Sequence, residues 1–338
     1  MTRKRWPLLL TALATWAVAG LHGGIEQRSP QPIRSDRLEV RLVDPGIKTL
    51  PGGAVEIEQA WHIASPDSGF GGFSALMVRA DGSMRLLGDT GMVASLAPSR
   101  TTGFRLEHLS LLPGMTARTP KWARDAESLT SSADAVWAGF EHRQAVARYD
   151  TSLTRLNAER RIAAMRNWPR NGGLEALVRL ADGRFLLLSE RAEVLGGTAA
   201  LLFSVDPVDP ATPPPLRFAY DAQGWGRLTD AAALPDGRVL LLHRAIAPSW
   251  RFWRAPLTFT TRIAIADPHA ISAETPWRGR LIATIGPDHP LADNHEGLAL
   301  DPARNPDGAV RLWMISDDNF NRWQRTLLVR MRVTLPPR

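Results

Sequence analysis

The sequence predicts an all-β protein, a β-propeller of six four-stranded blades, on three observations. A unit of two apolar strands joined by a hairpin turn recurs along the 338 residues at steps of roughly 50 residues, which indicates stacked supersecondary units. Many of these strands are apolar on both faces, so each sheet must be covered on both sides. The 26 prolines and 27 glycines interrupt nearly every stretch, which leaves few windows with a sustained helical period. Sheets packed on sheets in a ring explain all three observations, whereas a β-sandwich gives no reason for the long repeat.

The first 19 residues have the order of an export signal. Arg3-Lys4-Arg5 is basic, residues 8–18 are apolar, and Ala17-Val18-Ala19 is a small-x-small cleavage site. We therefore predict a signal peptide at 1–19 and a periplasmic or secreted protein. The apolar stretch is short for a membrane span, and no second one follows, so no stable span is expected after cleavage. An uncleaved N-terminal anchor is the alternative.

The remainder is expected to form an N-terminal segment at 20–54 and one propeller domain at 55–335, because no low-complexity linker divides it. A strand near 55–63 is expected to help the C-terminal strand at 327–333 close the ring. The proline-rich stretch 207–215 lies between apolar strands and is interpreted as a surface insertion.

Residues 174–191 show the repeated unit most clearly. Residues 177–180 form an apolar strand, Ala181-Asp182-Gly183-Arg184 supplies hairpin-turn chemistry, and residues 185–188 form the return strand. Related units lie at 72–89, 228–244 and 295–319, with a weaker one at 125–142.

Hairpin geometry places the residue that opens the first strand beside the residue that ends the second. If every unit is a blade, these ends gather on one rim around the central channel and form a ring of carboxylates. The expected pairs are Ser74 with Asp89, Glu127 with Glu141, Glu175 with Glu190, Asp230 with His243 and Arg244, and Glu296 with Asp317 and Asp318.

Such a ring predicts a cation site, because close carboxylates repel unless a cation neutralises them. Oxygen donors suit Ca²⁺, which accepts six to eight ligands in irregular geometry. The alternative is that these acids cap turns and pair with nearby arginines. The candidate metal ligands are Glu127, Glu175, Glu296, Asp317, Asp318 and Asn319.

The candidate catalytic residues are Glu296, His295 and Glu175, with Arg191, Arg244 and Arg325 as candidates for holding an anionic substrate. A histidine beside a turn can equally be a hydrogen-bonded structural residue. A serine nucleophile is not favoured, since Ser74 lacks the G-x-S-x-G elbow.

Two further features narrow the function. The chain has no cysteine, which excludes disulfides, thiolate metal sites and cysteine nucleophiles. The net charge of +7 comes from scattered arginines, so no nucleic-acid track is expected.

The segment Trp250-Arg251-Phe252-Trp253-Arg254 is interpreted as an exposed loop, with sugar stacking as the alternative.

The repeats and motifs together resemble the phytase-like family of exported bacterial proteins, described as having esterase-like activity, over residues 55–335. The most specific stretches are Asp293-Asn294-His295-Glu296-Gly297, Ser316-Asp317-Asp318-Asn319-Phe320 and Gln324-Arg325-Thr326-Leu327-Leu328. Further matches are Gly173-Leu174-Glu175 with Ser189-Glu190-Arg191, and Gly71-Gly72-Phe73-Ser74. The resemblance implies a β-propeller in an exported protein. The chain departs from the family pattern where the first unit has the single carboxylate Asp89 and where His243-Arg244 replaces an acid.

The predicted function is metal-dependent cleavage of phosphoesters or other esters at the acidic rim, by a monomer acting on a small anionic substrate. The alternative is a non-catalytic envelope propeller that binds a small ligand or a protein partner.

Overall fold

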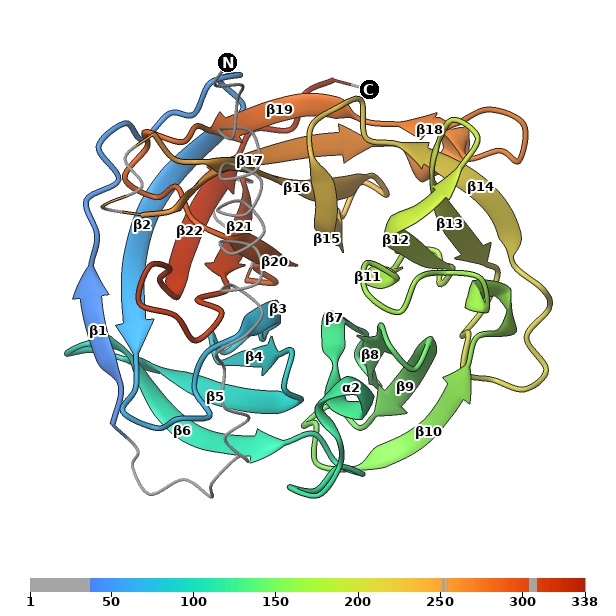
Figure 1. The fold of residues 1–338 in the computed structure, drawn as a ribbon, viewed down its shortest axis with the longest axis horizontal. Helices are drawn as coiled ribbons and strands as arrows, with labels where there is room; N and C mark the ends of the chain where they lie inside the picture. The colour runs from blue at the N-terminus through green and yellow to red at the C-terminus, as the bar shows by residue number, and fades with distance from the viewer. Residues whose placement is uncertain (1–36, 251–252, 254, 304–308, 338) are drawn as a thin grey trace, which may run out of the picture.

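The computed structural model describes residues 37–250, 253, 255–303 and 309–337, and it shows a propeller of five sheets arranged around one axis (Figure 1). The predicted signal peptide at 1–19 lies outside the described residues, as do Arg251, Phe252 and Arg254. Among the described residues, no helix is both long and apolar enough to cross a membrane.

The prediction of a propeller with four-stranded blades is confirmed, but the prediction of six blades is wrong, because the structure has five. The five repeated hairpin units each start one blade. The N-terminal strand β2 (Val55–Ala64) adds no blade of its own. It pairs antiparallel with the C-terminal strand β22 (Leu327–Val333) and completes the last sheet, which closes the ring.

The blades follow one another along the chain. Blade 1 contains β3 (Phe73–Val78), β4 (Met84–Gly88), β5 (Met92–Ser99) and β6 (Gly103–Leu111). Blade 2 contains β7 (Ala126–Ser131), β8 (Val136–Phe140), β9 (Ala145–Tyr149) and β10 (Leu156–Arg161).

Blades 3 and 5 each carry an additional edge strand. Blade 3 contains β11 (Leu174–Arg179), β12 (Phe185–Val194), β13 (Gly197–Phe203), β14 (Leu216–Asp221) and the parallel strand β18 (Trp277–Arg278). Blade 4 contains β15 (Arg227–Ala233), β16 (Val239–Pro248), β17 (Leu257–Ala266) and β19 (Arg280–Ile285). Blade 5 contains β20 (His295–Leu300), β21 (Val310–Ser316), β22, β2 and β1 (Glu39–Leu42).

The described helices are short: α2 (Lys121–Arg124), η1 (Ala163–Met165) and η2 (Pro268–Ala270).

Apolar layers between neighbouring blades hold the ring together. Five buried clusters fill the five blade interfaces, which explains why the strands are apolar on both faces. At the interface of blades 5 and 1, Trp61 of β2 stacks on Trp313 of β21 with ring centroids 5.6 Å apart. Phe104 of β6 packs edge-on against both rings. The closing strand is therefore fixed by aromatic packing as well as by its ladder.

The first strand of each blade lies nearest the axis, and neighbouring first strands contact one another in the closed order β3, β7, β11, β15, β20 (Figure 1). Each of these strands has a register shift at the same place near its start. A bulge re-aims a side chain out of the regular alternation of a strand. The residues at the shifts are Ser74, Glu127, Glu175, Thr229 and Glu296.

Candidate functional site

The candidate site is the end of the axis at which these five strands begin, and we call it the axial rim. Ten equivalent positions define it, two from each blade. The bulge positions are Ser74, Glu127, Glu175, Thr229 and Glu296. The other five positions each follow the second-strand residue that pairs with the residue before the bulge, and they are Asp89, Glu141, Glu190, Arg244 and Asp317. Seven of the ten are carboxylates, so the predicted acidic rim is present in the structure.

Blade 4 differs from the prediction because its bulge places Thr229, and not Asp230, at the rim position. Asp230 is buried, and its carboxylate accepts hydrogen bonds from the N–H groups of Ala231 (2.8 Å) and Leu298 (2.7 Å). Leu298 belongs to blade 5, so Asp230 connects two blades. Its role is structural, and blade 4 contributes no acid to the rim, where Thr229 and Arg244 take the two positions.

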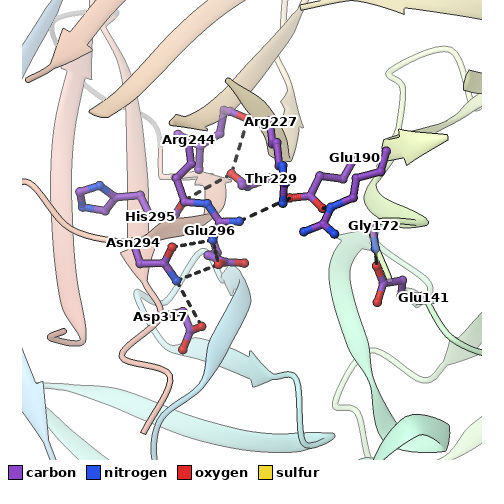
Figure 2. Close-up of polar contacts among 12 residues, drawn as sticks. Glu141, Gly172, Glu190, Arg227, Thr229, Arg244, Asn294, His295, Glu296 and Asp317 are labelled. Atoms are coloured by element: carbon purple, nitrogen blue, oxygen red, sulfur yellow. Dashed lines mark hydrogen bonds and ion pairs between the residues drawn. The ribbon is translucent and has the colours of Figure 1, made fainter. Parts of the chain in front are cut away.

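Arg244 neutralises one side of the rim. Its Nη1 donates to Asn294 Oδ1 at 2.5 Å and to Glu296 Oε1, while its Nη2 lies 3.4 Å from Glu190 Oε1 (Figure 2). Although burial opposes its charge, Glu296, Glu190 and Glu175 together raise the pKa of Arg244. Asn294 also donates from Nδ2 to Glu296 at 2.8 Å and to Asp317 at 3.3 Å. Glu190, Glu296 and Asp317 are therefore held by the Arg244 guanidinium, the Asn294 amide or both.

The other side of the rim has unpaired acids. Glu127 and Glu175 have no hydrogen-bond or ion-pair partner within the part of the chain that the structure describes. Burial, followed by the charges of Asp125 and Glu175, raises the pKa of Glu127 well above its usual range. Burial, followed by the charges of Glu190 and Glu141, does the same for Glu175. Glu175 is only 8 % exposed, and Arg244 offsets the charge of its ionised form only in part, because burial and the neighbouring acids outweigh it.

Blade 2 adds a histidine to these acids. His142 Nδ1 lies 2.5 Å from Asp125 Oδ2 and 3.5 Å from Glu141 Oε2. Glu141 Oε1 accepts the N–H groups of Gly172 and, at 2.8 Å, of Gly173 in the next blade. Burial, with Asp89 and Glu141 nearby, raises the pKa of Asp125 to about 8. Asp125 and His142 lie at the ends of the weakest repeat and are not among the site residues predicted from the sequence.

His295 lies away from the rim. It is fully buried, its Nδ1 is 2.8 Å from Thr261 Oγ1, and its ring points away from the Glu296 carboxylate (Figure 2). Burial lowers the pKa of His295 to about 3, so it is neutral at ordinary pH. The structure therefore separates this candidate catalytic residue from Glu296, its neighbour in the sequence.

Of the metal-ligand candidates in the Ser316–Phe320 stretch, only Asp317 takes a rim position. Asp318 Oδ1 accepts the N–H groups of Gly72 and Phe320, both at 3.0 Å, and its Oδ2 accepts the Thr326 hydroxyl at 3.0 Å. Asp318 thus ties blade 5 to blade 1. Asn319 is exposed and adopts a left-handed backbone with φ of 47°. Both residues shape the turn that presents Asp317.

The three candidate substrate-binding arginines already pair with acids. Arg191 Nε donates to Glu190 at 2.8 Å, and Arg325 Nε donates to Asp293 at 3.0 Å. Arg244 is held by Glu190 and Glu296, as described above. Each of the three guanidinium groups is therefore already paired with at least one acid.

Comparisons with known proteins place the chain in a family. A family model described as phytase-like, esterase-like activity of phytase, matches residues 68–320. The chain belongs to the phytase-like family. The match spans all ten positions of the axial rim, from Ser74 to Asp317. In this phytase-like chain the acid pattern is interrupted at Ser74, Thr229 and Arg244.

Several solved structures are similar to this phytase-like chain. Glutaminyl cyclase of Myxococcus xanthus is 13% identical over 83% of this chain and 97% of that chain, with a TM-score of 0.46. A streptogramin B lyase is 10% identical over 84% and 74%, with a TM-score of 0.39. Hydrazine synthase of Kuenenia stuttgartiensis is 12% identical over 73% and 77%, with a TM-score of 0.36. No curated protein matches the chain in sequence.

Proposed function

We propose that this phytase-like protein is an exported, calcium-dependent hydrolase that cleaves phosphoesters or other esters of small anionic substrates at the axial rim. The observation that carries the proposal is the pair Glu127 and Glu175. Both carboxylates face other acids and have no hydrogen-bond or ion-pair partner among the described residues. A folded protein tolerates such a group when it is protonated or when a cation binds it.

The donor set fits a calcium ion. Glu127, Glu175 and the neighbouring rim acids offer oxygen atoms only, and Ca²⁺ prefers oxygen ligands in flexible geometry. Because Arg244 already neutralises Glu190 and Glu296, the cation is expected beside blades 2 and 3. Bound there, Ca²⁺ would neutralise substrate charge and lower the pKa of a water molecule.

The chain's own residues divide the remaining work. Glu175 is the proposed general base, since its buried carboxylate is not committed to any donor among the described residues. Glu296 is held by Arg244 and Asn294, so it is proposed to orient the substrate and not to accept a proton. His295 is given no catalytic role, because its Nδ1 lies 2.8 Å from Thr261 Oγ1, away from the rim.

The experiment measures release of p-nitrophenol from p-nitrophenyl phosphate and p-nitrophenyl butyrate, with calcium and with the chelator EGTA. Turnover that requires calcium and falls about 10²–10⁴-fold in Glu175→Gln supports the proposal. Glu107→Gln is the matched control, because Glu107 pairs with Arg105 at the surface, on an outer strand. Calcium binding without turnover on either substrate would overturn the hydrolase and favour the binding propeller. Turnover that is unchanged in EGTA and in Glu175→Gln would overturn the proposed site.

A further inference from the structure

We propose that Asp125, Glu141 and His142 form a second metal site, selective for a first-row transition cation such as Zn²⁺. One ligand atom of each residue lies within 4.8 Å of the corresponding atoms of the other two. The site shares no residue with the Glu127–Glu175 pair. It stands on its own geometry and does not depend on the proposed hydrolase.

The fold brings the three residues together through one hairpin. Asp125 directly precedes β7, and Glu141 and His142 directly follow β8. These strands pair antiparallel with Ala126 opposite Phe140, and the Glu141 N–H continues the ladder to the Asp125 carbonyl at 3.2 Å. Strand pairing therefore fixes the three side chains near one another.

Glu141 is oriented toward the histidine before any ion binds. Its Oε1 is occupied by the backbone N–H groups of Gly172 and Gly173, which leaves Oε2 on the side of His142. Asp125 and Glu141 are buried, whereas the His142 side chain is 28 % exposed. The site is thus rigid on its acidic side and open to solvent at the imidazole.

The donor types select the metal. An imidazole nitrogen with two carboxylate oxygens suits Zn²⁺ and its first-row neighbours, whereas Ca²⁺ prefers oxygen ligands alone. His142 Nδ1 faces both carboxylates, as coordination of one ion by the three residues requires. Three protein ligands leave room for water at the ion.

The surrounding charge also favours a cation. Asp89 and Glu127 adjoin the same cluster, and Lys121, 2.9 Å from Asp89, is the only cationic side chain among the described residues that pairs with these acids apart from His142. Asp89 Oδ1 is buried without a hydrogen-bond partner in the described part of the chain. The Glu127 carboxylate has no partner there either. Lys121, together with the attraction of Arg124 for Asp89, leaves the four carboxylates only partly balanced, which favours a divalent ion.

The test is Zn²⁺ titration by calorimetry into the full-length protein kept in excess calcium. The wild type is expected to bind about one Zn²⁺ per chain and to release protons, seen as a buffer-dependent heat. His142→Gln and Asp125→Asn should each weaken Zn²⁺ binding at least about 100-fold. Glu175→Gln should keep Zn²⁺ binding, which separates this site from the proposed calcium site. Unchanged Zn²⁺ affinity in His142→Gln, or loss of Zn²⁺ binding in Glu175→Gln, would overturn the proposal.

A matched control variant and a protection experiment on the wild type complete the test of the Zn²⁺ site. His269→Gln removes an exposed histidine whose Nδ1 is 2.8 Å from Asp267 and should leave Zn²⁺ binding unchanged. In the wild type, Zn²⁺ should protect His142, but not His269, from modification by diethyl pyrocarbonate, mapped by mass spectrometry. Equal modification of His142 with and without Zn²⁺ would contradict the site even if the variants fail to fold.

Discussion

Replacing Arg244 with leucine tests how the axial rim balances its charge. The side chains of Arg244, Glu190 and Glu296 are 11%, 4% and 13% exposed, so all three are largely removed from water. Without the guanidinium, Glu190 keeps its contacts to Arg191 and Arg227, but Glu296 keeps only the Asn294 amide. The substitution leaves at least one buried carboxylate without a compensating charge.

The burial of these ion pairs determines how much stability the substitution of Arg244 should cost. Removing one partner of a buried ion pair costs about 3–5 kcal/mol. With an unfolding entropy of about 2.1 cal/mol/K per residue over roughly 300 residues, that cost lowers Tm by about 5–8 °C. In the wild type, calcium at a hundredfold excess over its Kd adds about 2.7 kcal/mol. The variant should gain more than this, because the freed carboxylate of Glu296 becomes an additional ligand.

The assay is thermal unfolding with calcium and with EGTA, in wild type, Arg244→Leu and the control Arg238→Leu. Arg238 is also a buried arginine, 2.6 Å from Asp236, but it lies in the turn region at the opposite end of β15 and β16. Both variants should lose stability, and only Arg244→Leu should show an enlarged calcium-induced rise in Tm. Equal calcium responses in the two variants would refute the charge balance inferred for the rim.

Three further outcomes are expected. In EGTA, urea unfolding should show the free energy of unfolding falling as pH rises from about 6.5 to about 8, because the pKa of Asp125 is raised from 3.8 to about 8 in the folded state. Burial lowers the pKa of His243 from 6.5 to about 4, so protonation of His243, which makes stability rise with pH, acts only below about pH 6.5. A free energy of unfolding that stays constant or rises between about pH 6.5 and about pH 8 would contradict the prediction for Asp125. Gly173→Ala should cost about 1–3 kcal/mol, since an added Cβ would lie 2.6 Å from the Pro169 carbonyl oxygen; unchanged urea unfolding would contradict the fit. Intact-mass measurement of exported protein should give a chain that starts at Gly20, and a retained residue 1 would show that the signal is not cleaved.

Much of the fold and the rim could be predicted from the sequence because both follow from local hairpin geometry. The repeats mark the blades, and antiparallel pairing places Glu127 beside Glu141 and Glu175 beside Glu190. The number of blades was overestimated because the role of β2 depends on its pairing with β22, which lies at the far end of the described chain. Local patterns do not show that a distant strand completes an existing sheet.

The errors at the site have equally physical causes. A bulge changes which residue of a strand faces the axis, and hairpin patterning does not locate it, so Asp230 was expected where Thr229 lies. The contacts of Arg244 join three blades and depend on the order of the ring. The cluster of Asp125 and His142 was missed because its repeat is the weakest of the five.

Calcium titration by calorimetry of the purified protein, beside the Glu127→Gln, Glu175→Gln double variant, tests the central claim most directly. Saturable calcium binding is expected in the wild type, and its loss is expected in the double variant. The double variant should unfold in EGTA at a temperature no lower than wild type, because it lacks two carboxyl groups that have no hydrogen-bond or ion-pair partner among the described residues. Wild-type protein that binds no calcium, or a double variant that binds it equally well, would contradict the assignment of these carboxylates.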